Sequence, residues 1–477
     1  MLFNSLSYAI FLPIVFTLYW LLPHKYRWTL LFVASYYFYM SWNAKYVFLI
    51  LFTTIISYLS AILIDKYREK KNIILLFTLI SCLGVLFVFK YLNFFFDLMT
   101  SVFSLFAIKL NTPTLNLLLP VGISFYTFQT LSYVIDVYRG NIQVERHFGY
   151  YATFVSFFPQ LVAGPIERPE NLLPQLKKER YFDYNTATYG MKLMAWGFFK
   201  KIVIADNLAV MVDKVYNNLS FYEGFAFVLA AIFFSIEIYC DFSGYSDIAK
   251  GSAKLLGIKL MDNFKSPYFS TTVKEFWSKW HISLSSWFKD YVYIPLGGNR
   301  CSKPRHYFNL LVTFLISGLW HGANITFVIW GGIHGLLQII EDIFHIKKEK
   351  KQFTLIWFIR VILIFIIMMF AWVFFRAQNI HEALYVIKHM FAGITNPKNY
   401  IVSGLYSFDK SAIELLIYLA IYLIPLIGFD IFNMNTDVIA YISKQNIVIR
   451  YTIYFVLVLA ILFLHYVGEV NFIYFQF

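Results

Sequence analysis

Charged residues are scarce in this sequence. Asp, Glu, Lys and Arg make up only 14% of the chain, whereas 59% of its residues are hydrophobic. A typical soluble protein has about 25% charged residues. The composition therefore excludes an ordinary soluble globular protein and indicates a polytopic membrane protein.

Cysteine is nearly absent, and the best-known catalytic motifs are missing. The three cysteines, Cys82, Cys240 and Cys301, are scattered and odd in number, so they indicate neither a disulfide framework nor a zinc site. Walker loops, dinucleotide-binding glycine fingerprints, serine nucleophile elbows and HExxH segments do not occur in the sequence. We therefore expect no metal and no permanently bound cofactor.

The net charge of +13 does not indicate nucleic-acid binding here. The Lys and Arg residues cluster in short loops between apolar runs, which is typical of residues that fix membrane topology. Their alternation places the N-terminus outside and predicts cytoplasmic loops at Lys66–Lys71, Lys177–Arg180 and Lys347–Lys351. The first run, Leu6–Leu22, lacks a cationic start and a small-residue cleavage site, so we interpret it as a retained span.

The apolar runs predict an all-α polytopic integral membrane protein with about 11–13 transmembrane helices plus re-entrant and interfacial helices. No internal repeat is visible, and no soluble segment is long enough to fold alone. Residues 1–477 are expected to form one membrane domain with a motif-rich core at about 117–340. The predicted single spans are Leu6–Leu22, Trp28–Trp42, Tyr46–Ile64, Ile73–Phe96, Leu117–Tyr138, Ala187–Leu208, Gly224–Cys240, Leu355–Phe375, Ala412–Phe432 and Tyr451–Val467.

One apolar run, Phe148–Ile166, is interrupted by Pro159, Gly164 and Pro165 and has basic residues on both sides. Cations at both ends predict a re-entrant segment that returns to the cytoplasmic side. Non-helical backbone at membrane depth is stable only against protein or a water-filled cavity. The run therefore predicts a cavity on the cytoplasmic side.

A second run, Tyr307–Ile340, contains no Asp, Glu, Lys or Arg and is again flanked by basic residues. As one helix it would be about 51 Å long at ~1.5 Å per residue, whereas a bilayer core is only ~30 Å thick. We therefore predict a helical hairpin with Gly322–Asn324 near its turn and His321 deep in the membrane. A polar residue at that depth is a candidate for function, although a core histidine bonded to Ser317 or Asn324 is the alternative.

The segment Phe276–Asp290 has the pattern of an amphipathic helix. At about 100° per residue its aromatic residues and Leu284 share one arc, while Lys279, Lys289 and Asp290 lie on the other side. This pattern predicts one helix in the membrane interface. His281 falls at the border of the apolar arc, where a histidine either reaches toward water or serves in function.

Two acidic residues interrupt or directly follow the strongly apolar run Gly224–Cys240. Glu237 and Asp241 are one helical turn apart and share a face. Isolated charge inside a membrane is costly, so each is expected either to pair with a lysine of a neighbouring span or to belong to a proton relay.

Histidine is the remaining candidate for catalysis. A neutral imidazole can remove a proton from an attacking hydroxyl near neutral pH. This role suits acyl transfer from an activated ester to an alcohol, because a thioester donor needs no metal, only positioning and proton removal.

Several motifs together resemble the membrane-bound O-acyltransferase family, and among its branches the bacterial alginate O-acetyltransferase type is the most similar. The resemblance extends from the first span to about His334 and is weaker beyond it. The motifs are LPVGISFYTFQ at Leu119–Gln129, GPI at Gly164–Ile166, DFSGYSD at Asp241–Asp247, EFWSKWHISLSSWFKDY at Glu275–Tyr291, YIPLGGNR at Tyr293–Arg300 and GLWHGA at Gly318–Ala323.

The resemblance implies a fold with a central tunnel, in which His321 is catalytic and His281 supports it. Residues expected to line the tunnel are Trp280, Trp320, Asn324 and Asp241. The implied donor is acetyl-CoA or another acyl thioester on the cytoplasmic side of a bacterial inner membrane. Its phosphates are expected to meet Arg300, Lys303 and Arg305, although a cytoplasmic loop has the same composition.

The resemblance also implies that the acceptor is an extracytoplasmic polysaccharide or a partner that modifies it. Relatives in this branch pass the acyl group to a separate serine-esterase-like protein outside the membrane. The sequence shows no exported catalytic domain, so a partner of this kind is expected. No nucleic acid is expected among the ligands.

Two other functions stay open. D-alanyl transfer from a carrier protein to teichoic acid needs the same two histidines, although the long segment Arg376–Asp409 and the sugar-acetylation-type motifs favour acetyl transfer. A transporter would use Glu237 and Asp241 in a proton pathway, but the inverted repeat typical of transporters is not visible.

Overall fold

The computed structural model describes all residues except 111, 114–116, 163, 409–410, 469, 471 and 474–477. Among the described residues, helices are the dominant structure and no residue is assigned to a strand. This confirms the predicted all-α class. The described chain divides into two compact units, Met1–Met194 with Ile248–Met261, and Ala195–Asp247 with Asp262–Phe477. The expectation of a single membrane domain stays a prediction.

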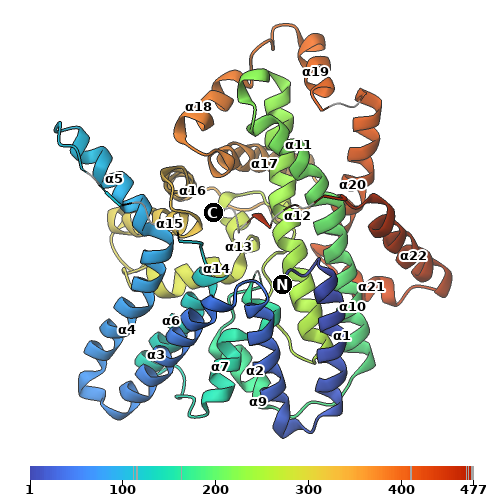
Figure 1. Cartoon of the computed structure of the whole chain (residues 1–477). Coiled ribbons are helices and arrows are strands. Elements are labelled where there is room, and N and C mark those ends of the chain that lie inside the picture. Colours follow the sequence, from blue (N-terminus) through green and yellow to red (C-terminus); the bar gives the residue numbers. More distant parts are fainter. Residues whose placement is uncertain are drawn as a thin grey trace. The chain divides into compact units, whose positions relative to one another are not determined.

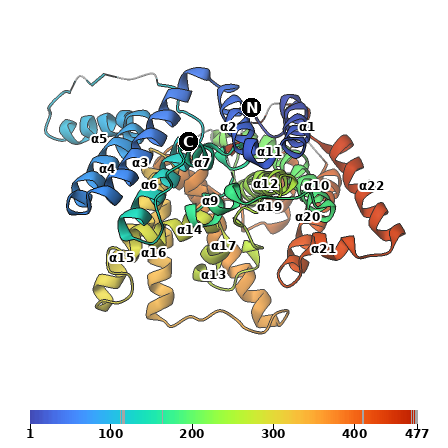
Figure 2. The ribbon, with the colours of Figure 1, turned by 90° about the horizontal axis from the view of Figure 1, so that it is seen from below.

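The first unit contains the N-terminal helices. Within it, α3 packs against both α4 and α6, and the three lie side by side (Figure 1, Figure 2). A π-helical turn at Phe87–Tyr91 joins α4 to α5. The helices are α1 (Leu6–Leu21), α2 (His24–Met40), α3 (Val47–Lys66), α4 (Lys71–Leu86), α5 (Leu92–Ser104), α6 (Ile123–Arg139), α7 (Phe148–Ser156), α8 (Phe158–Leu161) and α9 (Pro169–Lys177).

The interrupted run Phe148–Ile166 is broken as predicted. It forms α7 and α8, of nine and four residues; α8 is buried, and α7 is buried from Tyr151 to its end. The carbonyl of Phe154, near the end of α7, accepts hydrogen bonds from the side chains of Gln129 (2.7 Å) and Gln160 (2.8 Å). Buried broken backbone needs such partners, so the break is stabilised by protein on this side. Its re-entrant path through the membrane stays a prediction.

The second unit holds most of α12 and all helices after it; α10 and α12 have residues in both units. A π-helical segment, Phe199–Ala205, joins α10 to α11 and carries Lys200 and Lys201. The helices are α10 (Tyr184–Phe198), α11 (Asp206–Tyr216), α12 (Phe225–Leu255), α13 (Val273–Lys279), α14 (Ile282–Phe288), α15 (Lys303–His321), α16 (Ile325–Ile343), α17 (Leu355–Arg376), α18 (Ile380–His389), α19 (Pro397–Tyr406), α20 (Ala412–Asn433), α21 (Val438–Ser443) and α22 (Ile447–Leu464).

Six helical stretches in the described chain are long and apolar enough to cross a membrane, and each overlaps a predicted span. They confirm a polytopic membrane protein, while the total number of spans stays a prediction. The segment after α17 contains α18 and α19, and its last residue, Asp409, lies outside the described residues. The six stretches are Ala44–Lys66, Arg68–Ser104, Phe225–Leu255, Leu355–Arg376, Ala412–Asn433 and Ile447–Leu464.

Candidate active site

The predicted hairpin is present as α15 and α16, joined at Gly322–Asn324. The two helices pack at very short range at Gly318. A Cβ atom there would lie closer than 3.0 Å to the carbonyl oxygen of Phe327. The side chain of Asn324 caps α16 by accepting a hydrogen bond from the Thr326 amide (3.0 Å). This cap satisfies an amide that the helix itself leaves unpaired.

His321 is the last residue of α15 and is 3% exposed. Its imidazole contacts three aromatic rings at nearly right angles. The ring centroids lie 5.1 Å from Trp320, 5.0 Å from Trp330 and 5.3 Å from Phe375. The hairpin thus supplies two walls around His321, and α17 supplies the third.

The prediction of one interfacial helix over Phe276–Asp290 is wrong. The segment forms two short helices, α13 and α14, with a break at Trp280 and His281. His281 has φ +43° and ψ 53°, a left-handed conformation that is uncommon outside glycine. The predicted border position is also wrong, since His281 is 0% exposed. The apolar arc is buried inside the protein instead of facing the membrane interface, with Trp277, Trp280 and Leu284 all below 9% exposure.

The break has a tertiary cause. The loop residue Asn263 accepts a hydrogen bond from the Ile282 amide on its carbonyl oxygen (2.9 Å). Its side-chain oxygen accepts one from the Ser283 hydroxyl (2.6 Å). The same side-chain oxygen also accepts from the Ser283 amide (3.4 Å), so Asn263 satisfies two backbone amides that a continuous helix would have bonded internally. A strained residue held by its surroundings in this way is a feature of functional sites.

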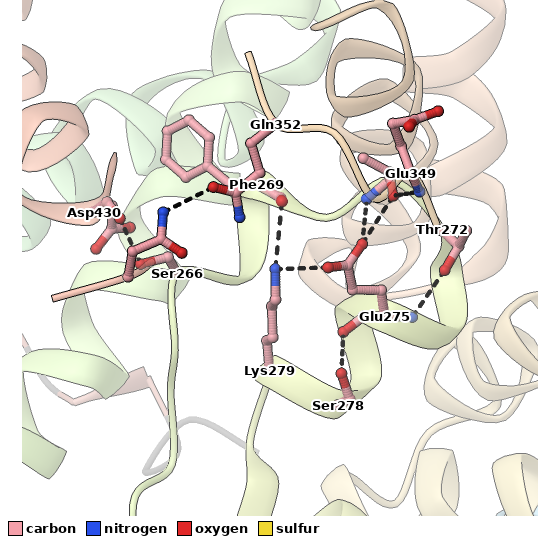
Figure 3. A network of polar contacts seen from close by, with 11 residues as sticks. Ser266, Phe269, Thr272, Glu275, Ser278, Lys279, Glu349, Gln352 and Asp430 are labelled. Atoms are coloured by element: carbon pink, nitrogen blue, oxygen red, sulfur yellow. Dashed lines mark hydrogen bonds and ion pairs between the residues drawn. The ribbon is translucent and has the colours of Figure 1, made fainter. Parts of the chain in front are cut away.

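Polar contacts also fix the start of α13 (Figure 3). Thr272 caps the helix by accepting from the Glu275 amide (3.0 Å), and Lys279 forms an ion pair with the Glu275 carboxylate (3.0 Å). Lys279 also donates to the carbonyl of Phe269 (3.4 Å). From α16, the carboxylate of Glu341 accepts hydrogen bonds from the first two amides of α13. The short helix that leads to His281 is therefore anchored at its N-terminus.

The structure brings the two predicted histidines together. Their ring centroids lie 6.5 Å apart, and the Trp320 ring contacts both. Phe242 packs against the His281 ring (4.6 Å). His281 lies outside the six helical stretches that are long and apolar enough to cross a membrane. Burial of its side chain lowers its pKa from 6.5 to about 3. His281 is therefore neutral at pH 7 and is better suited to orient a group by hydrogen bonding than to act as a strong base.

A cavity of about 1430 Å³ lies between α13, α14, α15 and α16, and neither histidine is among its described lining residues. Its exposed lining is mainly basic: it includes Lys274, Lys289, Arg300, Lys303 and Lys347, together with the acidic Asp342. Its buried lining is formed by aromatic and hydroxyl side chains, namely Trp277, Phe288, Thr313 and Ser317. Ser317 lies one turn before His321, and the lining residue Ile282 directly follows His281. The cavity thus runs from a cationic surface to positions next to both histidines.

Of the other predicted site residues, some line the cavity and others do not. Arg300 and Lys303 line the cavity, whereas Arg305 is not among its described lining residues and donates to the Leu296 carbonyl (3.4 Å). The Trp320 ring contacts both histidines, at 6.1 Å from His281 and 5.1 Å from His321. Asn324 serves as the cap of α16 and donates to the Gln378 carbonyl (2.6 Å).

Trp280 and Asp241 lie in structural clusters rather than on the described cavity lining. Trp280 packs on Trp372 (5.0 Å). Asp241 forms an ion pair with Lys201 (2.6 Å) and accepts a hydrogen bond from the Ile473 amide (2.8 Å). The expected pairing of Asp241 with a lysine is confirmed.

Sequence reasoning missed three aromatic residues close to His321. Trp330 lies in the charge-free run Tyr307–Ile340, and its spacing of four from His334 is the signal that the sequence offers. Phe375 and Trp372 lie on α17, and no pattern in the sequence connects them with His321. Trp330 contacts both Trp372 (5.6 Å) and Phe375 (5.2 Å).

Comparisons with known proteins agree with this geometry. A family model described as the membrane-bound O-acyltransferase family matches residues 145–379, which include both histidines. The probable alginate O-acetylase AlgI of Pseudomonas syringae pv. tomato is 39% identical over 388 residues, which are 80% of this chain and 74% of the relative. The peptidoglycan O-acetyltransferase of Helicobacter pylori is 36% identical over 427 residues, covering 82% of this chain and 80% of the relative.

A more distant relative is the teichoic acid D-alanyltransferase of Bacillus subtilis, 29% identical over 261 residues, which cover 50% of this chain and 62% of the relative. The extent of the alignments with the two acetylating relatives, together with the family match and the six long apolar helices, settles the class of the protein. The chain belongs to the membrane-bound O-acyltransferase family and is a multi-pass membrane O-acyltransferase.

Proposed function

We propose that the protein transfers an acetyl group from acetyl-CoA in the cytoplasm toward an extracytoplasmic polysaccharide, from a bacterial inner membrane. The relatives named for alginate and peptidoglycan acetylation support this acceptor class. The observation that carries the proposal is the histidine pair beside a cavity whose exposed lining is cationic.

The cationic lining suits the phosphates of CoA. Lys and Arg side chains form charge-assisted hydrogen bonds with phosphate oxygens, and the presence of Arg300 and Lys303 on the exposed lining supports this role. The cavity lining follows α15 from Lys303 to Ser317, a distance of about 21 Å at ~1.5 Å per residue. His321 lies one further helical turn along α15, so a pantetheine arm that follows this lining has its thioester directed toward His321.

The reaction then needs one proton acceptor. The acceptor hydroxyl oxygen attacks the thioester carbonyl carbon, its proton passes to His321, and a carbon–oxygen bond forms. The carbon–sulfur bond breaks, and the proton on His321 is transferred to the departing thiolate. His281 is a positioning residue that holds the reacting group near His321. The products are an O-acetyl ester and free CoA.

We further propose that the acetyl group reaches the polysaccharide through a serine-esterase-like partner outside the membrane. D-alanyl transfer from a carrier protein is the second candidate, supported by the similarity to teichoic acid D-alanyltransferases over half of the chain. The longer alignments with acetylating relatives favour acetyl transfer.

Labelled donors distinguish these functions. A strain of the source organism without the native gene expresses either wild-type protein or His321→Ala. Its membranes are incubated with labelled acetyl-CoA or with a carrier protein charged with labelled D-alanine. We expect label from acetyl-CoA in an envelope polysaccharide, only with wild-type protein. Label from the D-alanyl carrier alone would support the second candidate. Uptake of a solute that is unchanged by His321→Ala, without consumption of either donor, would indicate a transporter.

A further inference from the structure

The side chains packed on His321 leave little room beside it. Trp330 is 0% exposed and Phe375 is 1% exposed. Phe375 contacts His321 (5.3 Å), Trp330 (5.2 Å) and Phe327 (4.8 Å). Trp330 and Phe375 thus lie against the imidazole, and Phe327 packs on Phe375; these three rings are called the aromatic wall.

The backbone around His321 is equally crowded. A Cβ atom at Gly322, directly after His321, would lie closer than 3.0 Å to the ring of Phe327. A Cβ atom at Gly318, one turn earlier, would meet the backbone of Phe327 at similarly short range. The glycines at these two positions therefore let α15 pack directly against Phe327, as is usual in a protein interior at native packing density, which has few voids.

The donor cavity contrasts with this site. It has a volume of about 1430 Å³, and its buried lining extends to Trp277, which packs on Trp330 (5.6 Å). The cavity thus accommodates a large donor, while the wall restricts whatever is attached to the carbonyl beside His321. The aromatic wall therefore restricts the length of the acyl chain, whereas the cavity does not restrict the rest of the thioester.

We propose that the aromatic wall, and Phe375 above all, limits the acyl group to two carbons. This inference rests on the proposed function and adds the residues that set its acyl specificity. Each methylene added to the acyl chain must displace a ring of the wall, so kcat/KM falls by about 10-fold or more per methylene. Phe375 is the residue to change because it comes from α17, whereas Trp330 and Phe327 also hold the hairpin together.

A series of acyl donors tests the proposal. Wild-type protein, Phe375→Ala and Phe375→Leu are compared with acetyl-, propionyl- and butyryl-CoA in the membranes described above, with label in the polysaccharide as the readout. We expect wild-type protein to prefer acetyl-CoA over butyryl-CoA by about 100-fold or more, which is two methylene steps. Phe375→Ala should reduce that ratio by at least tenfold, and Phe375→Leu should reduce it less.

Phe370→Ala is the matched control. Phe370 lies on the same helix, but its ring packs on Phe391 (6.4 Å) instead of His321. We expect the wild-type acyl preference in this variant. The size-exclusion profile of each variant in detergent shows whether it is folded. If Phe375→Ala is not folded, the acyl preference of Phe375→Leu tests the proposal instead.

Two outcomes separate this proposal from the proposed function. If wild-type protein transfers no acyl group from any CoA thioester, the proposed function fails. If wild-type protein transfers acetyl and butyryl groups equally well, or if folded Phe375 variants keep the wild-type ratio, the aromatic wall does not set the acyl length and this inference fails alone.

Discussion

The rings of His281 and His321 lie 6.5 Å apart, measured between centroids. This separation is too long for a direct hydrogen bond between the two rings, yet one hydroxyl group between them can contact both. His321 comes from the end of a helix and His281 from a strained break between two helices. The two histidines can therefore act on one bound group while being held by different parts of the second unit.

The first prediction concerns His321. Replacing it with alanine removes the proposed general base, which is expected to lower the rate of acyl transfer by about 10²–10⁴-fold. Expression and membrane insertion should be unchanged, as judged by immunoblotting of the membrane fraction. Near-normal turnover in His321→Ala would remove His321 from the mechanism.

The second prediction separates the ring of His281 from its backbone. Asn tolerates a left-handed conformation and Ala does not, at a cost of about 1–2 kcal/mol. We therefore expect His281→Asn and His281→Ala to lose a large part of the activity, with only His281→Ala also losing thermal stability in detergent. Wild-type activity in His281→Asn would mean that the imidazole has only a packing role.

The third prediction concerns the buried charges of the second unit. Lys201 pairs with Asp206 (2.8 Å) and Asp241 (2.6 Å), and its side chain is 1% exposed. Lys201→Met leaves two buried carboxylates uncompensated, which is expected to cost about 3–5 kcal/mol of unfolding free energy. Adding Asp241→Asn to this variant should restore part of that loss.

Thermal unfolding in detergent measures these effects, and Lys444→Met, at an exposed position, is the control with no expected change. If Lys201→Met were as stable as Lys444→Met, the pairs would contribute nothing to stability. If the added Asp241→Asn destabilised the protein further, repulsion between uncompensated carboxylates would not be the cause of the loss.

The fourth prediction tests the membrane topology. Single cysteines in Lys66–Lys71, Lys177–Arg180 and Lys347–Lys351 should react with an impermeant thiol reagent only from the cytoplasmic side, because cationic loops stay there. The exposed Cys301 must first be replaced, whereas Cys82 and Cys240 are buried. Labelling of the middle site from outside would contradict the re-entrant path of Phe148–Ile166.

The sequence was most informative where a physical limit applied. The run Tyr307–Ile340 is too long for one span and has no charge, so a hairpin with His321 near its turn was the predicted solution, and the structure contains that hairpin. The periodicity of Phe276–Asp290 continues through His281, so the break was not predictable locally. Its cause is Asn263, whose contacts with Ile282 and Ser283 are tertiary.

The contacts between separate helices were also not predictable from the sequence. The motifs identified both histidines, but no pattern predicted that their rings would meet or that Phe375 of α17 would close the site. Ring contacts of this kind depend on how α13, α15 and α17 pack, and packing between elements is not encoded in the periodicity of any one of them.

The last prediction concerns how the acyl group crosses the membrane. The donor thioester belongs to the cytoplasm, whereas a polysaccharide of this type is modified outside. If the pantetheine arm enters through the basic cavity and the acceptor approaches His321 from elsewhere, acyl transfer and membrane crossing are one event. Ser285 lines the cavity, and its hydroxyl donates a hydrogen bond to the carbonyl of Trp280 (3.2 Å), the residue directly before His281. Ser285→Trp should therefore narrow the cavity and raise the KM for acetyl-CoA, with little change in the KM for the acceptor.

Ser403→Trp, on the exposed face of α19, is the control and should change neither constant. Steady-state kinetics with each substrate varied in turn measure the effect, because a substitution that acts only on donor entry changes one KM and leaves the other. Sealed vesicles of known orientation then show on which side the product forms. Loss of affinity for both substrates together, or labelled acceptor only on the donor side, would contradict separate entry and require that both substrates use the same opening.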